Sequence, residues 1–196
     1  MPYQESHPLV ASTDLTMEEF LVEIEKKAYR MIVISIGDHG DAMDILQECM
    51  IKLVTKYGQH PSEQWKPLFY RILHNKITDW HRHQKVKNLL FFWKADTQDD
   101  NDSNGNQIEN IADNYSGQKS PMEALEQSQL HQTVIDALSG LSVKQQECFL
   151  LRSWEGLSVA DTAHIMGCSQ GSVKTHYSRA VAKIKQSLEA RHDYRI

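Results

Sequence analysis

The chain has 196 residues, of which 40% are hydrophobic, and its 26 acidic and 21 basic side chains give a net charge of −5. No apolar run approaches the ~20 residues that a membrane-spanning helix requires, and the start Met1-Pro2-Tyr3 lacks the features of a signal peptide. The three cysteines are odd in number and far apart, which argues against a disulfide framework. We therefore expect one or two small domains in a reducing cytoplasm, without membrane insertion.

The charge is distributed unevenly along the chain. Residues 1–60 carry a net charge of −5 and residues 94–127 a net charge of −6. By contrast, residues 66–87 hold six basic residues and one acidic residue, and residues 169–196 hold six basic and two acidic residues. Neutralisation of phosphates dominates the affinity of proteins for DNA. Two basic segments in an acidic background thus predict weak DNA binding by the chain alone and action together with a partner.

The first two predicted helices have clear start and stop signals. The sequence from Thr16 to Glu19 forms a capping box, and the first helix should end near Gly37. A second helix, ending at Gly58, has apolar residues at the helical spacing typical of one buried face. These residues are Ala42, Ile45, Leu46, Cys49, Met50, Leu53, Val54 and Tyr57.

A third helix is predicted from about Gln64 to His83, with Pro67 in its first turn. Its apolar positions should face inward, and they are Leu68, Phe69, Ile72, Ile77 and Trp80. The short apolar run at 89–93 is expected to cap this first domain. Residues 94–119 are rich in Asp, Asn, Gln, Ser and Gly, which is typical of a flexible linker.

The second half should contain further short helices. We predict them at about 121–139, 143–153, 159–166 and 170–189. Because no segment of useful length alternates with a period of two, the predicted fold class is all-α, with two small helical domains joined by a flexible acidic linker.

The last two of these helices have the signature of a helix-turn-helix. Ser158 can cap the first helix with Asp161 three residues later, Gly167 can end it, and Ser169 can cap the second helix. Small donors near the start of the second helix, with basic residues beyond them, suit insertion into the major groove of DNA. Val173 and Tyr177 are interpreted as core residues. The candidate DNA-contacting residues are Ser172, Lys174, Thr175, Ser178, Arg179 and Lys183.

With both halves considered, the chain resembles a group IV (extracytoplasmic-function) bacterial RNA polymerase sigma factor. Residues 41–48, DAMDILQE, resemble part of conserved region 2, and residues 68–82, LFYRILHNKITDWHR, resemble the helix that opens the promoter −10 element. Residues 141–185 resemble region 4, which reads the −35 element. The resemblance implies region 2 at 14–93, a linker at 94–119 and region 4 at 120–190. In one departure, Leu68 stands where many members have tryptophan, and Trp65 lies three residues earlier.

The resemblance also implies a bacterial cytoplasmic protein with defined partners. These are core RNA polymerase, through the β′ clamp helices and the β flap, and promoter DNA; whether an anti-sigma factor also binds is left open. The residues implied to bind the core polymerase are Asp41, Asp44, Gln47 and Glu48. Those implied to act at the −10 element are His60, Ser62, Arg71, Asn75, Lys76 and Arg82. The residues implied to bind the −35 element are the helix-turn-helix residues named above.

Other interpretations stay open at this point. The acidic residues at 41–48 could be a solvated helix face. The histidines near residues 60–83 lack a convincing set of further metal ligands, and no catalytic constellation or cofactor motif is found. The alternative function is a stand-alone helix-turn-helix regulator of the response-regulator type, although residues 1–93 show no strand pattern of a receiver domain. A helical adaptor without DNA binding is a third hypothesis, and the two basic segments argue against it.

Overall fold

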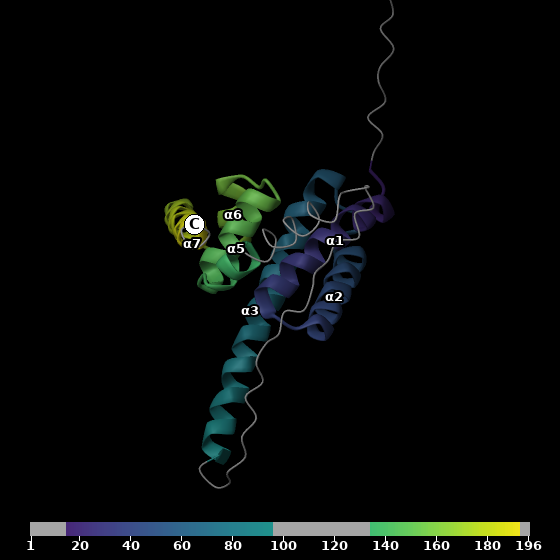
Figure 1. The fold of residues 1–196 in the computed structure, drawn as a ribbon. Coiled ribbons are helices and arrows are strands. Elements are labelled where there is room, and N and C mark those ends of the chain that lie inside the picture. Colours follow the sequence, from purple (N-terminus) through teal and green to yellow (C-terminus); the bar gives the residue numbers. More distant parts are fainter. Residues whose placement is uncertain (1–14, 96–133, 193–196) are drawn as a thin grey trace, which may run out of the picture.

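The computed structural model describes residues 15–95 and 134–192, and within these ranges all regular structure is helical (Figure 1). This confirms the predicted all-α class. Residues 134–139 are helical. The named elements are α1 (Met17–Ile36), α2 (His39–Tyr57), α3 (Ser62–Ala95), α5 (Val143–Phe149), the π-helical turn η1 (Leu150–Trp154), α6 (Val159–Ile165) and α7 (Gln170–His192). Among the described residues, no helix is long and apolar enough to span a membrane.

Helix α1 begins and ends where its local sequence predicts. The Thr16 hydroxyl accepts a hydrogen bond from the Glu19 amide at 3.2 Å, and the Glu19 carboxylate accepts one from the Thr16 amide at 2.9 Å. These bonds lower the pKa of Glu19, the backbone bond contributing most. At the other end, Gly37 adopts a left-handed φ of 75°, and its N–H donates to the carbonyl of Val33 at 2.8 Å. The predicted capping box and the glycine stop are confirmed.

Helices α1, α2 and α3 form a bundle with an apolar core. An aromatic cluster fills one end of it, where the ring of Phe20 lies 5.9 Å from Trp65 and 6.5 Å from Phe69 between centroids. Val54 was expected on the buried face of α2 but is 45% exposed. It lies at the edge of the apolar stripe, where the bundle no longer covers it. The buried residues of α2 are Ala42, Ile45, Leu46, Cys49 and Leu53.

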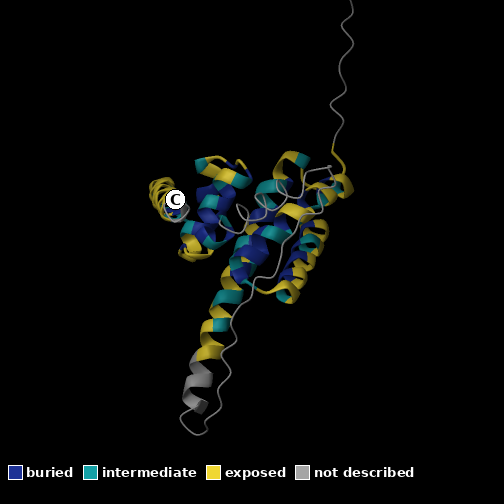
Figure 2. Cartoon of the chain, in the orientation of Figure 1, coloured by how far each residue is buried: buried dark blue, intermediate teal, exposed yellow. Residues whose placement is uncertain are grey.

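Helix α3 is longer than the sequence analysis predicted. It begins at Ser62 rather than Gln64 and continues to Ala95 rather than ending at His83. After Pro67 the segment contains neither glycine nor proline, so nothing in it stops helix propagation. The earlier start also places Pro67 beyond the first turn. Beyond the bundle, α3 projects as an exposed helix (Figure 2). The side chains of the apolar run at 89–93 and most of the predicted linker at 94–119 lie outside the described residues.

The second half packs its short helices against α7. Val173 of α7 is fully buried, and Ala163 of α6 is 7% exposed. Gly156 and Gly167 have φ angles of 66° and 60°, and a Cβ atom at either would meet nothing within 4 Å. Glycine is therefore required there for backbone conformation rather than for space. The predicted helix at 121–139 is described over residues 134–139 and lies otherwise outside the described part.

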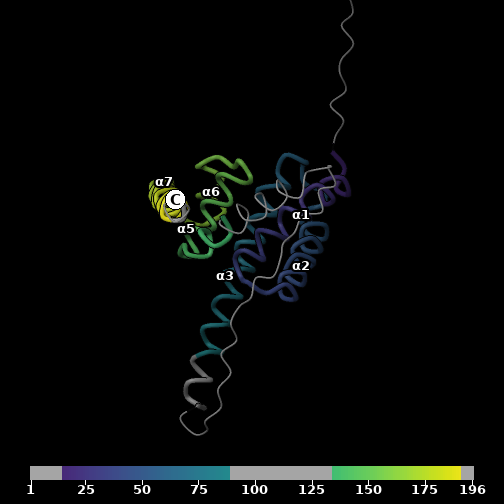
Figure 3. Tube along the Cα trace, in the orientation of Figure 1, coloured from purple at the N-terminus to yellow at the C-terminus, as the bar shows by residue number. Residues whose placement is uncertain are grey.

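The two halves pack against each other across α3. In the tube view, α3 passes between the pair α1–α2 and the group α5–α7 (Figure 3). Helix α3 contacts α6, and α1 contacts α5, so the apolar residues of both halves join in one continuous core. The sequence predicts two domains, and the structure adds an interface between them.

Candidate nucleic-acid and polymerase interfaces

The turn between α6 and α7 is fixed by local hydrogen bonds. The Ser158 hydroxyl accepts from the Asp161 amide at 3.0 Å and donates to the Asp161 carboxylate at 2.6 Å. The Ser169 hydroxyl accepts from the Ser172 amide at 3.1 Å, and Gly167 supplies the left-handed residue between the helices. The helix-turn-helix predicted from these residues is confirmed.

One face of α7 is anchored to the protein core. The carbonyl of Val173 accepts a hydrogen bond from the buried Cys148 thiol at 3.3 Å. The ring of Tyr177 stacks on Phe149 with centroids 6.2 Å apart and an interplanar angle of 15°, and its hydroxyl lies 2.9 Å from that of Ser153. Both residues of α7 that the sequence analysis assigned to the core therefore pack inward, which fixes the rotation of the helix.

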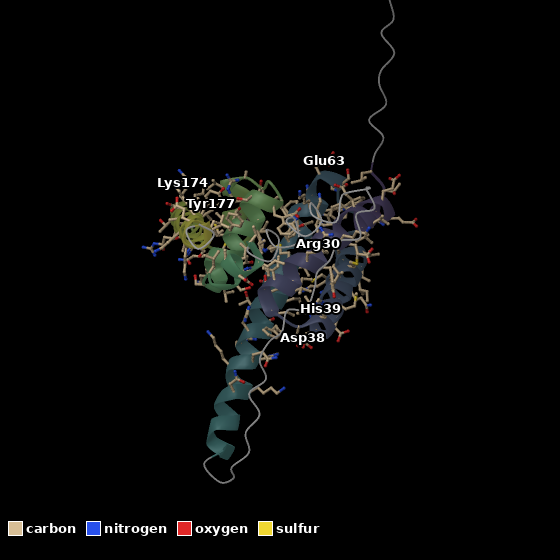
Figure 4. The ribbon with its side chains drawn as sticks, viewed as in Figure 1. Arg30, Asp38, His39, Glu63, Lys174 and Tyr177 are labelled. Atoms are coloured by element: carbon tan, nitrogen blue, oxygen red, sulfur yellow. The ribbon has the colours of Figure 1, made fainter. Side chains whose placement is uncertain are left out.

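The other face of α7 carries the candidate DNA-contacting residues. Lys174 lies on the outer side of the helix, away from α5 and α6 (Figure 4). The Thr175 hydroxyl donates to the carbonyl of Gly171 at 3.0 Å, and the Lys183 ammonium donates to the carbonyl of Gly140. Ser172 is half-buried, and its hydroxyl lies 3.0 Å from the capping hydroxyl of Ser169. The remaining members of the set are exposed, namely Lys174, Thr175, Ser178, Arg179 and Lys183.

The candidate polymerase-binding residues of α2 divide into two pairs. Asp44 and Gln47 are exposed. Asp41 is half-buried and accepts a hydrogen bond from the indole N–H of Trp80 at 2.6 Å, whereas Glu48 forms an ion pair with Lys76. The hydrogen bond to Glu48 raises the pKa of Lys76. The expected acidic face of α2 is thus partly joined to α3, and Asp44 and Gln47 are its freely accessible part.

The candidate −10 residues do not form a single surface. Arg71, Asn75 and Arg82 share one face of α3 by helical spacing, whereas Lys76 lies roughly 140° from Arg71 around the helix. Arg82 pairs with Asp79 at 3.1 Å. Lys76 instead faces α2, which is the reason it meets Glu48.

The loop before α3 also differs from expectation. The segment from Tyr57 to Trp65 contains the aromatic and polar residues that a pocket for an unpaired base requires, and such a pocket is the expectation from the sequence. Trp65 is only 7% exposed and packs on Phe20, so it belongs to the core. His60 and Ser62 remain at the accessible start of α3, where the His60 ring lies 3.3 Å from the side-chain oxygen of Gln64 and 5.4 Å from the ring of Tyr57.

Contacts between the two halves were not found from the sequence. Lys66 pairs with Glu155 at 3.3 Å, His74 contacts Glu147, and Arg71 lies 2.8 Å from the His164 ring nitrogen. The partners are separated by 73 to 93 residues, so no local pattern connects them. Among the described residues, no three histidine, cysteine, aspartate or glutamate side chains converge as metal ligands.

Comparison with known proteins finds one matching family model and several similar sequences. The family described as sigma-70, region 4, matches residues 131–184, which include α5, η1, α6 and most of α7. The RNA polymerase sigma-E factor of Streptomyces coelicolor is 28% identical over 182 residues, covering 90% of this chain and 88% of that protein. Residues 131–184 thus match sigma-70 region 4, and the chain as a whole is similar to extracytoplasmic-function sigma factors. The helix-turn-helix lies within the region 4 match.

A further relative is similar in sequence, and a solved structure is similar in fold. The chain is 28% identical to the ECF RNA polymerase sigma factor BldN of Streptomyces coelicolor, covering 82% of this chain but 55% of BldN. In fold it is similar to the sigma factor RpoE of Bartonella quintana, with a TM-score of 0.63, 20% identity, and coverage of 88% of this chain and 96% of that one. The response-regulator alternative is not favoured by these relatives.

Proposed function

We propose that this sigma factor binds core RNA polymerase and directs promoter-specific initiation by recognising −10 and −35 elements. The observation that carries the proposal is the exposed, basic and hydroxyl-bearing face of α7 within the region 4 match. The protein then acts as an initiation factor in the bacterial cytoplasm, where the polymerase works, and the bond-forming chemistry belongs to the polymerase.

Recognition of the −35 element is assigned to α7. The core contacts of Val173 and Tyr177 hold the helix so that Lys174, Ser178 and Arg179 face outward. An arginine can donate two hydrogen bonds to guanine in the major groove, and removing such a contact costs ~1–3 kcal/mol of discrimination. A lysine contact to phosphate instead strengthens binding to every sequence. Arg179 and Lys174 are the candidates for these two roles.

The first half is assigned to polymerase binding and to strand opening. We propose region 2 at 14–93, a linker at 94–119 and region 4 at 120–190. Asp44 and Gln47 present the accessible part of the α2 face to the β′ clamp helices, and region 4 meets the β flap. Arg71, Asn75 and Arg82 share the face of α3 that would approach the −10 strand. Asp41, Glu48 and Lys76 would contribute after exchanging their contacts within the chain.

An anti-sigma factor is proposed as a further partner class. The Bartonella quintana protein of similar fold was solved in complex with the anti-sigma factor NepR. A regulator that binds both halves of this sigma factor would block access to polymerase. A copurifying protein that inhibits in vitro transcription, and that an excess of core polymerase displaces from the sigma factor, would support this assignment. Transcription that no copurifying protein affects would contradict it.

Run-off transcription with purified core polymerase tests the function. Arg179→Ala should relax the choice among promoters in a library with randomised −35 sequences, because a base contact is lost. Lys174→Ala should reduce the use of all promoters alike and lower the salt dependence by about one ion. Lys185→Ala is the matched control, since Lys185 is exposed on α7 and pairs with Glu189 of the same helix at 3.7 Å. Unchanged promoter choice and strength in both test variants would contradict the assignment of α7.

A further inference from the structure

The two ring nitrogens of His176 lie in different surroundings. Nδ1 is shielded from solvent and finds no hydrogen-bond partner among the residues that the structure describes, although the side chain as a whole is only half-buried. The other nitrogen, Nε2, is not buried in this way. Most buried polar atoms in proteins are paired, so an unpaired one calls for an explanation. His176 lies in the second turn of α7 and does not belong to the candidate DNA-contacting residues named above.

The ring lies where the outward face of α7 meets its buried face. One row of polar side chains spans about 60° around the helix axis, and it consists of Ser172, His176, Arg179 and Lys183. One turn after His176, Arg179 is exposed and Ala180 is fully buried. One edge of the imidazole is therefore covered, and the other edge lies in the row of polar side chains that includes Arg179.

The covered nitrogen determines which neutral form of the ring fits the site. Neutral imidazole carries one N–H group and one bare nitrogen. In the protein backbone, buried N–H groups are left without a partner less often than buried acceptors, and the same preference applies to the ring. The form with its proton on Nε2 leaves only the bare nitrogen in the covered position. His176 then presents an N–H donor, and no acceptor, to the outside of α7.

We propose that His176 is a specificity-determining residue, which donates a hydrogen bond from Nε2 to N7 of a purine in the −35 element. The inference rests on the proposed function. N7 is an acceptor that both guanine and adenine present in the major groove, whereas cytosine presents a donor. The N-terminal part of a recognition helix reaches the base edges, and His176 lies in that part of α7. It would therefore require a purine at one position, and Arg179 would read a different base.

Two substitutions separate the roles of the two ring nitrogens. The amide of glutamine can place a donor near the position of Nε2, whereas the shorter asparagine reaches only the position of Nδ1. Run-off transcription by holoenzyme with the full-length chain, from a library of randomised −35 sequences, measures the purine preference. His176→Asn should reduce this preference about two- to tenfold, as expected for one neutral hydrogen bond, and His176→Gln should retain most of it. The matched control is His83→Asn, which makes the same exchange at an exposed position of α3.

The second test changes the DNA and begins with the unmodified protein. 7-Deazaguanine and 7-deazaadenine carry a C–H group in place of N7 and keep their Watson–Crick pairing. At the purine that the library selects, this replacement should weaken promoter use by the unmodified holoenzyme about two- to tenfold. It should have no effect on the His176→Asn holoenzyme, because that contact is already lost. The measurement on the unmodified holoenzyme does not depend on whether a variant folds.

Two results would overturn this role of His176. One is a purine preference that is absent at every −35 position or equal in His176→Asn and His83→Asn. That outcome includes a His176→Asn variant that weakens all promoters alike, as loss of a phosphate contact would. The other is full use of the 7-deazapurine promoters by the unmodified holoenzyme. Neither result bears on the proposed function, which Lys174→Ala and Arg179→Ala test separately in the run-off assay.

Discussion

Gln146 connects the two halves of the chain through one buried carboxamide. Its side-chain nitrogen donates to the carbonyl of Ile34 at 3.2 Å and to that of Leu138 at 3.1 Å. Ile34 lies in the last turn of α1, and Leu138 lies near the end of the helical segment 134–139. Carbonyls at helix ends lack partners within the helix, so the amide satisfies two helix ends from a residue that is 5% exposed.

Replacing this amide with an apolar side chain should destabilise the protein measurably. In Gln146→Leu the Ile34 carbonyl loses this donor in a buried place, which costs about 1–3 kcal/mol. The Leu138 carbonyl keeps the N–H of Leu141 at 3.0 Å, so its loss is nearer ~0.5–1.5 kcal/mol. The expected decrease in the free energy of unfolding is therefore about 1.5–4.5 kcal/mol.

Gln146→Glu separates hydrogen bonding from shape. A carboxylate of the same size would face two carbonyl oxygens with no proton to donate, so this variant should be less stable than Gln146→Leu at neutral pH. Protonation restores one donor, because the buried carboxyl in the folded state binds its proton more tightly than in the unfolded chain. Its stability should thus recover as the pH is lowered, relative to Gln146→Leu.

Urea unfolding followed by tryptophan fluorescence and circular dichroism measures these changes, since Trp154 reports on the second half. The control is Gln186→Leu, which makes the same substitution at an exposed position of α7. A Gln146→Leu variant that is no less stable than Gln186→Leu would refute the reasoning and show that the amide bridge contributes little in solution.

Burial raises the pKa of Cys49 to about 12 and that of Cys148 to about 11. Iodoacetamide should therefore label the half-buried Cys168 first in the folded protein, as mass spectrometry would show. Equal labelling of all three cysteines would contradict this packing. Burial also lowers the pKa of His81 from 6.5. Below pH 6.5 the unfolded chain then binds more protons than the folded protein, so the melting temperature should decrease as the pH is lowered. The decrease should be less steep in His81→Phe, and parallel curves for the two proteins would contradict this. Gly167→Ala forces a left-handed alanine and should cost ~1 kcal/mol in urea unfolding, whereas an unchanged midpoint would exclude strain there.

Features of this fold that depend on neighbouring residues were predictable from the sequence. The capping box at Thr16, the N-cap at Ser158 and the glycine turn at Gly167 link residues within four positions, so their chemistry is visible in the printed letters. The buried stripe of α2 follows from helical spacing in the same way. The predicted end of α3 at His83 was wrong, because the sequence contains no stop signal there and the helix continues to Ala95.

Features that depend on the approach of distant segments could not be predicted. Asp41 and Trp80 were placed correctly on their helices, but nothing in the sequence indicated that one would bond to the other. The same holds for Glu48 and Lys76, which were assigned to different partners and pair with each other in this structure. The roles of these residues toward polymerase and DNA stay predictions, because the packing shows contacts within the chain and does not test binding to another molecule.

The π-helical turn η1 sets the direction in which Glu155 points. The amide of Glu155 donates to the carbonyl of Leu150 five residues earlier, at 3.1 Å, so this turn holds one more residue than an α-helical turn would. Deleting one residue from η1 would restore α-helical spacing and rotate the position after it by about 100° around the helix axis. A change in chain length of a single residue would then be sufficient to turn this carboxylate away from Lys66.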